Sequence, residues 1–236
     1  MADTDWDDYA ASYDRMAELN PAYQALLGDF LSFVRSEGLA DGKRDVLDVG
    51  SGTANFSVAM AKANPEARLT LVEPSAEMQR RALAKLEGHA SVAAETGTLE
   101  EATLSTSGYD LILSTHALYT TPDPAAHLRH LRSCCRVNGW LYVVDLGRVM
   151  NILDWRLYLT PRIVAAVGFF EAIRLLRFGE NLARHNRAIR EQQLNGTYWV
   201  HTAEEMTFML QETGWQVMRQ WTTYRGYSDA AVCRPA

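Results

Sequence analysis

The sequence predicts a doubly wound α/β fold built on a seven-stranded, mostly parallel sheet. Three observations predict it. Strand-like and helix-like segments alternate through the middle of the chain, a glycine turn joins the first strand to the next helix, and residues 225–227 alone separate the last two strands. Alternation at these lengths indicates right-handed βαβ crossovers between parallel strands. The short final connection fits a hairpin, so we expect the last strand to be antiparallel.

Two helices are expected ahead of the sheet. Apolar residues recur mostly three or four positions apart between residues 14 and 34, which is helical periodicity. Pro21 interrupts the pattern, so we expect a short helix, a turn at Asn20-Pro21 and a longer helix to about Glu37. These helices make up the expected N-terminal cap, residues 1–40.

The predicted core, residues 45–145, alternates strand and helix. Pro65, Gly88 and the turn Val137-Asn138-Gly139 separate its elements, because proline and glycine end regular structure. The expected strands and helices are, in chain order, strand 45–49, helix 54–63, strand 68–72, helix 75–87, strand 91–94, strand 109–114, helix 124–136 and strand 139–145.

The segment 151–195 follows the fifth strand and is long and helical in character. We expect it to form a helical lid, within residues 150–198, inserted into the sheet topology. With 236 residues and 47% hydrophobic content, the chain can bury one substantial core, so we expect a single domain, 1–236. The remaining part, 199–236, supplies one helix and two strands, expected at 203–213, 215–224 and 228–233.

Composition excludes several classes of function. A balance of 23 Lys and Arg against 29 Asp and Glu gives a net charge of −6, which argues against nucleic acid as a partner. The three cysteines, Cys134, Cys135 and Cys233, have neither a disulfide nor a metal-binding spacing, and we expect reduced thiols in a cytoplasmic protein. The first residues are acidic, unlike a signal peptide, and no apolar run approaches the ~20 residues of a membrane span.

The most informative motif is the glycine turn after the first strand. It reads Asp48-x-Gly50-x-Gly52-x-Ala54, and the next strand ends in Glu73 about 20 residues later. Glycines allow positive φ and let the backbone approach a ligand, and a carboxylate at that spacing suits a ribose diol. A dinucleotide fingerprint requires a third glycine where this chain has Asn55, so the pattern weakens that interpretation.

The motif resembles motif I of the class I S-adenosylmethionine-dependent methyltransferases, and the resemblance spans roughly Val46 to Val144. It implies a Rossmann-like fold, S-adenosylmethionine as the cofactor, and Glu73 as the residue that binds both ribose hydroxyls. Thr98 stands where the family commonly has an aspartate at the adenine edge. The expected cofactor-binding residues are Tyr13, Asp48, Gly50, Ser51, Gly52, Asn55, Glu73, Pro74, Met78, Gly97, Thr98, Leu99, Ser114 and Thr115.

Trp6, Tyr9 and Tyr13 lie ahead of the predicted helices. They are candidates to fold over the cofactor, because aromatic faces attract cations and a sulfonium is one. Packing of the N-terminal helix on the domain explains the same residues equally well.

Four residues at or just after strand ends or lid boundaries are candidates for catalysis. His116 is the candidate general base, since an imidazole titrates near neutrality. Methyl transfer is an in-line displacement with a neutral thioether as leaving group, so alignment can supply most of the acceleration. The candidate catalytic residues are His116, Tyr119, Asp145 and His201.

The lid carries the only indication of the acceptor. Trp155, Tyr158, Phe169 and Phe170 favour a flat or apolar group, whereas Arg174, Arg184, His185 and Arg190 favour a carboxylate or phosphate. We therefore expect an aromatic or anionic small-molecule acceptor. The arginine-rich lid equally fits a homodimer surface.

Two other functions remain open at this stage. One is a cyclase or lyase that consumes S-adenosylmethionine and releases methylthioadenosine. The other is a binding module that retains the cofactor fold without catalysis.

Overall fold

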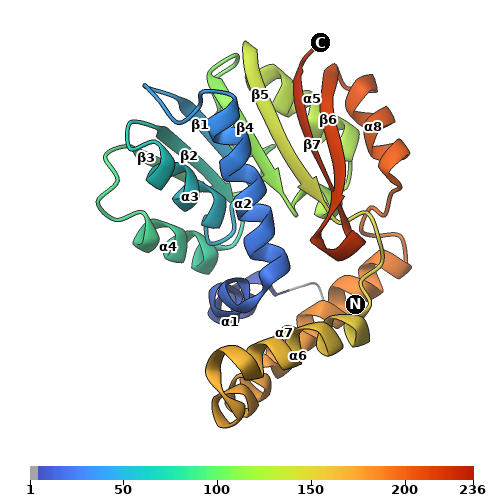
Figure 1. Cartoon of the computed structure of the whole chain (residues 1–236). Helices are drawn as coiled ribbons and strands as arrows, with labels where there is room; N and C mark the ends of the chain where they lie inside the picture. Colours follow the sequence, from blue (N-terminus) through green and yellow to red (C-terminus); the bar gives the residue numbers. More distant parts are fainter. Residues whose placement is uncertain (1–4) are drawn as a thin grey trace.

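A seven-stranded sheet runs through the molecule in the order β3-β2-β1-β4-β5-β7-β6 (Figure 1). The computed structural model describes residues 5–236, except for the side chains of residues 11, 12, 16 and 176–182. The first five strands are parallel, and β7 pairs antiparallel with both β5 and β6. The predicted doubly wound fold is thereby confirmed. The strands are β1 Asp45–Val49, β2 Arg68–Glu73, β3 Val92–Thr96, β4 Tyr109–Thr115, β5 Cys135–Asp145, β6 Trp215–Thr223 and β7 Ser228–Pro235.

Helices cover both faces of the sheet and its carboxyl edge. Aromatic rings of α2 and α3 pack on one face of the sheet. The ring centroid of Phe30 lies 5.4 Å from that of Phe56 and 5.2 Å from that of Tyr142. On the other face, α5 and α8 pack around Trp215, whose indole N–H donates to Leu128 O at 3.1 Å. The helices are α1 Trp6–Leu19, α2 Pro21–Ser36, α3 Asn55–Ala63, α4 Ala76–Lys85, α5 Pro124–Cys134, α6 Ile152–Val167, α7 Phe169–Leu194 and α8 Ala203–Glu212.

The structure corrects the predicted turn at 137–139. These residues lie inside β5, which begins at Cys135, directly after α5. The register between β4 and β5 shifts after the pair Tyr109–Cys135, and this irregularity takes up the extra residues. A Cβ at Gly139 would lie 2.6 Å from Cys135 Sγ, so glycine is present because the backbone folds tightly there and not because the chain reverses.

The first helix also begins earlier than predicted. Asp5 caps α1 by accepting a hydrogen bond from Asp8 N–H at 3.0 Å, so the helix includes Tyr9 and Tyr13. The turn at Asn20-Pro21 is confirmed, because Asn20 caps α2 through a hydrogen bond from Ala22 N–H at 3.0 Å. The aromatic residues of α1 therefore project from a helix with a fixed position.

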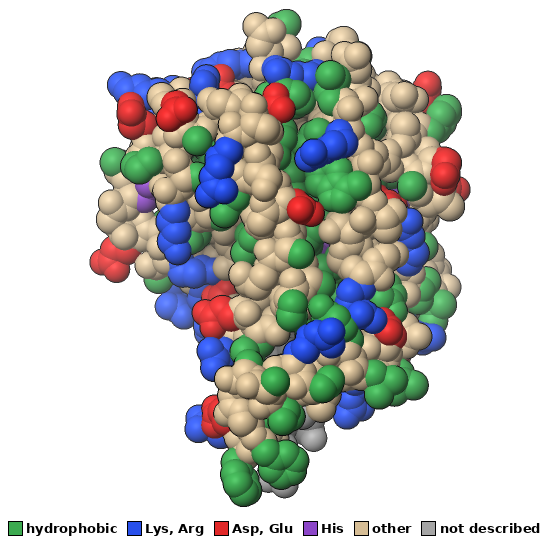
Figure 2. Space-filling view, viewed as in Figure 1, with side chains coloured by type: hydrophobic (Ala, Val, Ile, Leu, Met, Phe, Trp, Pro, Cys, Tyr) green, Lys and Arg blue, Asp and Glu red, His purple; other side chains and the backbone are tan. Residues whose placement is uncertain are grey.

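The inserted segment forms two helices, α6 and α7, separated at Gly168, which has φ +82°. Together with α1 they lie across the carboxyl ends of the parallel strands (Figure 1). Their far end, at the junction of α6 and α7, is apolar on the outside, because Phe169 and Phe170 are exposed there, and hydrophobic side chains gather at the bottom of Figure 2. No helix in the described part of the chain is long and apolar enough to cross a membrane.

Candidate functional site

A cavity of about 520 Å³ opens at the carboxyl ends of the central strands, which is within the usual size of a small-molecule site. Its floor is the glycine turn after β1, and its walls come from the ends of β2 and β4, from α1 and from the lid. An open α/β sheet binds ligands at this point, where the strand order reverses. Residues predicted to bind the cofactor that line it are Tyr13, Gly50, Ser51, Gly52, Glu73, Pro74, Met78, Gly97, Thr98, Leu99 and Thr115.

The glycine turn contains three residues with positive φ, and Ala54, with φ +59°, is the one that is not glycine. Gly50 has φ +64° and donates its N–H to Val72 O at 2.9 Å, and a Cβ there would lie 2.4 Å from the Cβ of Ala117. Gly52 has φ +54° and approaches Met78 Sδ. The close approach of Ala117 therefore requires glycine at position 50, a side chain at position 52 would be strained by its positive φ, and both glycines leave room for a ligand against the turn.

Glu73 is fixed at the edge of this turn. Its Oε2 accepts a hydrogen bond from Gly52 N–H at 2.8 Å, and its Oε1 accepts one from Ser75 N–H at 2.9 Å. Burial raises the pKa of Glu73, although both backbone bonds favour the ionised form. Each carboxylate oxygen retains acceptor capacity, so the group can accept two further hydroxyl hydrogen bonds.

Three predicted cofactor residues lie outside the cavity lining: Asp48, Asn55 and Ser114. Asp48 is buried below the turn, where Oδ2 accepts a hydrogen bond from Ser57 Oγ at 2.6 Å, and burial raises its pKa to about 7. Within the described residues, Asp48 Oδ1 and Ser114 Oγ have no hydrogen-bond partner. Asn55 accepts a hydrogen bond from Lys85 Nζ at 2.8 Å.

Helix α1 closes one side of the cavity with the rings of Trp6, Tyr9 and Tyr13. Its acidic residues attach it to the rest of the site. Asp7 Oδ1 accepts from Ser75 Oγ at 2.5 Å, and Asp14 accepts from Lys85 Nζ at 2.9 Å. The aromatic face of α1 is thereby held over the glycine turn.

His116 and Tyr224 meet in the cavity with unusual backbone conformations. Their φ angles are +53° and +49°, and their ring centroids lie 4.9 Å apart. The His116 Nε2 atom lies 2.9 Å from Ser228 Oγ, and burial lowers the pKa of His116 to about 4. Positive φ in residues other than glycine is costly and gathers at functional sites. Sequence reasoning missed Tyr224, since no local pattern marks a residue whose role depends on the β6–β7 connection.

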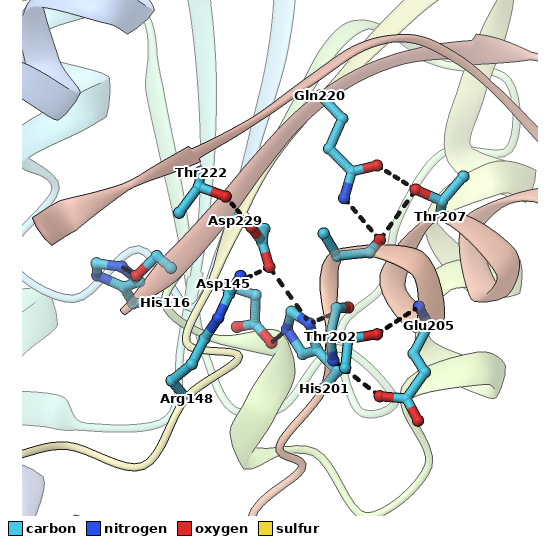
Figure 3. Close-up of polar contacts among 12 residues, drawn as sticks. His116, Asp145, Arg148, His201, Thr202, Glu205, Thr207, Gln220, Thr222 and Asp229 are labelled. Atoms are coloured by element: carbon cyan, nitrogen blue, oxygen red, sulfur yellow. Dashed lines mark hydrogen bonds and ion pairs between the residues drawn. The ribbon is translucent and has the colours of Figure 1, made fainter. Parts of the chain in front are cut away.

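The candidate catalytic residues divide into two pairs. His116 and Tyr119 line the cavity, whereas Asp145 and His201 are fully buried outside its lining, with 3.5 Å between Asp145 Oδ2 and His201 Nε2. Figure 3 shows this pair beside Asp229, which also pairs with Arg148. The second pair holds a residue of the cavity wall in place, because Asp145 accepts a hydrogen bond from Tyr119 N–H.

The basic side chains expected to receive an anionic acceptor also lie outside the cavity lining. Arg184 and His185 both pair with Asp8 of α1, and Arg174 lies 3.6 Å from Glu171 on its own helix. Arg190 is exposed. Of the four lid aromatic residues, Trp155 alone is in the lining, because Phe169 and Phe170 face outward and Tyr158 packs behind Trp155.

Comparison with known proteins assigns the family. A family model described as a methyltransferase domain matches residues 16–220. The chain belongs to this methyltransferase family. The predicted class of enzyme, its transferase activity and its cofactor, S-adenosylmethionine, are confirmed. Among curated proteins, none matches this methyltransferase.

Solved structures share the fold of this methyltransferase. A chain from the complex of the Trm112 methyltransferase activator with a methyltransferase of Haloferax volcanii is 14% identical, with TM-score 0.64 and coverage of 100% of this chain and 99% of that chain. Magnesium protoporphyrin IX methyltransferase from Synechocystis PCC 6803, with SAH bound, is 17% identical, with TM-score 0.60 and coverage of 91% and 84%. Mitomycin 7-O-methyltransferase is 19% identical, with TM-score 0.54 and coverage of 82% and 49%.

The residues of this methyltransferase fit the cofactor. The cavity combines a glycine turn that leaves the backbone open to a ligand, a fixed carboxylate at Glu73 for a diol, and aromatic rings for a sulfonium. Among the residues that the structure describes, no group of His, Cys, Asp and Glu is arranged to hold a metal ion.

Proposed function

We propose that this methyltransferase transfers the methyl group of S-adenosylmethionine to a small-molecule acceptor held between the glycine turn and the lid. The observation that carries the proposal is one continuous cavity lined by residues from Glu73 to Trp155, which can hold a cofactor at one end and an acceptor at the other. Structural neighbours named for magnesium protoporphyrin IX and mitomycin support a small-molecule acceptor.

Each part of the site has a role in binding. Glu73 accepts both ribose hydroxyls, and the backbone around Gly50, Ser51 and Gly52 contacts the amino-acid and ribose parts. Asp48 holds the turn from below. Pro74 and Met78 cover the adenine, whose edge contacts the segment 97–99.

The chemistry requires alignment more than proton transfer. S-Adenosylmethionine, when bound, supplies a methyl group on a sulfonium sulfur. The leaving group is the neutral thioether that remains after the methyl group is transferred. His116 and Tyr119 orient the acceptor on the side of the methyl group opposite the sulfur. Helix α1 and the lid exclude water from the site. Alignment of this kind is worth about 7–11 kcal/mol in favourable cases. His116 is uncharged near neutral pH, so it approaches the acceptor without adding a positive charge beside the sulfonium.

The structure does not favour release of methylthioadenosine. A cyclase or lyase requires a cavity closed around the cofactor, so that only an internal nucleophile reaches the sulfonium. Here the cavity continues from the glycine turn to Met150, Trp155 and Ile189 in the lid region, which leaves room for a second molecule.

Binding and turnover test this proposal separately. Calorimetry with S-adenosylmethionine and S-adenosylhomocysteine should show one site per chain, and Glu73→Ala should weaken both. Mass spectrometry after incubation with S-adenosylmethionine alone should show the cofactor unchanged. Accumulation of methylthioadenosine without added acceptor would contradict methyl transfer.

Two further expectations are also proposals. A homodimer through the exposed apolar side chains of the lid, which include Leu157 and Phe170, is tested by sedimentation velocity. A cytoplasmic location agrees with three buried cysteines that form no disulfide: Cys134, Cys135 and Cys233.

A further inference from the structure

The lid side of the cavity is lined by aromatic rings from distant parts of the chain. Tyr224 lies between His116 and Trp155, at ring distances of 4.9 Å and 4.7 Å, and Tyr119 lies 5.2 Å from Tyr198 in an edge-on arrangement. All five line the cavity. We call these five residues the ring wall.

The ring wall is preformed. Tyr224 stands on the strained connection between β6 and β7, and its hydroxyl accepts a hydrogen bond from Asn20 Nδ2 at 3.2 Å. The next residue, Arg225, pairs with Asp154 of α6 at 2.7 Å, which ties this connection to the helix that carries Trp155. A rigid aromatic surface binds a flat ligand without an added cost of ordering the side chains.

Near the ring wall, the described lining residues supply no Arg or Lys side chain to pair with an anionic acceptor. Among the described residues that line the cavity, none is Arg or Lys, and the ionisable ones besides histidine and tyrosine are Glu73 and Glu100. The lid residues Arg184 and His185 contact Asp8 outside it. A carboxylate buried against the ring wall would lose its hydration without gaining a cationic partner.

We propose that the ring wall binds a planar, uncharged aromatic acceptor that packs against Trp155 and Tyr224. The side-chain amide of Asn186 and the hydroxyl of Thr197, which also line the cavity, are available to its neutral polar substituents. This inference rests on the proposed function, because the ring wall lies at the acceptor end of the same cavity.

Three small probes test it in protein saturated with S-adenosylhomocysteine. The probes are 2-naphthol, which is planar and uncharged at neutral pH, 2-naphthoate, which is planar and anionic, and decahydro-2-naphthol, which is uncharged and not planar. Equilibrium dialysis should show 2-naphthol binding most tightly, with 2-naphthoate at least about tenfold weaker. Decahydro-2-naphthol should be weaker as well, because it lacks aromatic faces.

A matched pair of variants locates the probe. Trp155→Leu should weaken 2-naphthol binding about tenfold and leave the Kd for S-adenosylhomocysteine unchanged. Phe170→Leu removes a lid ring that is 86% exposed and outside the cavity lining, so it should change neither affinity.

Equal or tighter binding of 2-naphthoate by the native protein would overturn the inference, as would full 2-naphthol affinity in a folded Trp155→Leu variant. Failure of the native protein to bind S-adenosylhomocysteine would instead refute the proposed function. The comparison of probes uses native protein and therefore holds even if the Trp155 variant fails to fold.

Discussion

Asp145 and Tyr119 connect a buried group of polar side chains to the wall of the cavity. Asp145 Oδ1 accepts a hydrogen bond from the Tyr119 backbone N–H at 3.1 Å, and Asp145 lies fully buried at the end of β5, beside His201. Tyr119 belongs to the short helical turn Leu118–Thr120, which follows β4 and lines the cavity. The position of this turn therefore depends on a carboxylate that has no place in the cavity lining.

Asp145→Ala should destabilise the protein and weaken acceptor binding together. The change leaves the buried Tyr119 N–H without an acceptor, which costs about 1–3 kcal/mol. Denaturant unfolding measures the loss, and acceptor KM should rise while cofactor Kd stays near native. Asp145→Asn keeps a carbonyl oxygen for the same bond and should be milder. Equal effects of both variants would show that charge, and not this hydrogen bond, is what matters.

Glu73→Gln should weaken cofactor binding roughly 10- to 100-fold, because the diol loses a charge-assisted acceptor. The carboxylate of Glu73 accepts hydrogen bonds from the backbone N–H groups of Gly52 and Ser75. In the glutamine variant, an NH₂ group faces one of these two donors and cannot accept its hydrogen bond. Calorimetry with S-adenosylhomocysteine gives the affinity. The exposed Glu66→Gln variant is the control. Native affinity in Glu73→Gln would remove this residue from the ribose site.

Gly50→Ala should abolish cofactor binding, while Gly42→Ala should not. Both glycines have positive φ, +64° and +70°, so each substitution costs about 1–2 kcal/mol of backbone strain. A Cβ at Gly50 also meets Ala117 at 2.4 Å, whereas nothing lies within 4 Å at Gly42. Thermal unfolding and calorimetry on the pair separate strain from collision. Similar losses in both variants would contradict the close approach at Gly50.

Asp48 should make the ligand-free protein less stable as pH rises. Burial raises its pKa to about 7 in the folded state, above its ordinary value, so the folded protein holds a proton that the unfolded chain has lost. This contribution is fully present below about pH 4 and disappears as pH rises through about 7, at about 1.4 kcal/mol per unit of pKa difference. Urea unfolding of Asp48→Asn across this range should lack that part of the decline. The exposed Asp41→Asn variant should follow the native curve.

The ionisation of His116 should not affect the pH dependence of kcat near neutral pH. Burial lowers its pKa to about 4, which is poorly matched to proton abstraction at neutral pH. We expect kcat to show no inflection near about pH 6.5, the ordinary histidine value. Loss of His116 in His116→Asn should cost less than the about 100-fold expected of a general base. A larger loss together with an inflection at that pH would establish His116 as the base.

Local patterns were sufficient for the fold and for most of the expected cofactor residues to lie in one cavity. The Gly50 and Gly52 turn and the acid at Glu73 belong to one βαβ unit, so spacing along the chain already determines their spacing in the structure. Eleven of the predicted cofactor residues line one cavity for this reason. Where local patterns misled, as at Gly139, glycine served a close backbone approach and was misinterpreted as a turn.

The sequence by itself therefore determined the doubly wound sheet, the glycine turn and the cofactor, because these depend on periodicity and short spacing. Only the tertiary structure decided the lid side of the cavity. Tyr224 meets His116 because the β6–β7 connection returns to β4's end, and Arg184 turns to Asp8 because α7 packs on α1. Contacts between residues so far apart in the chain have no local signature, so ring packing and ion pairing there become visible only once the chain is folded.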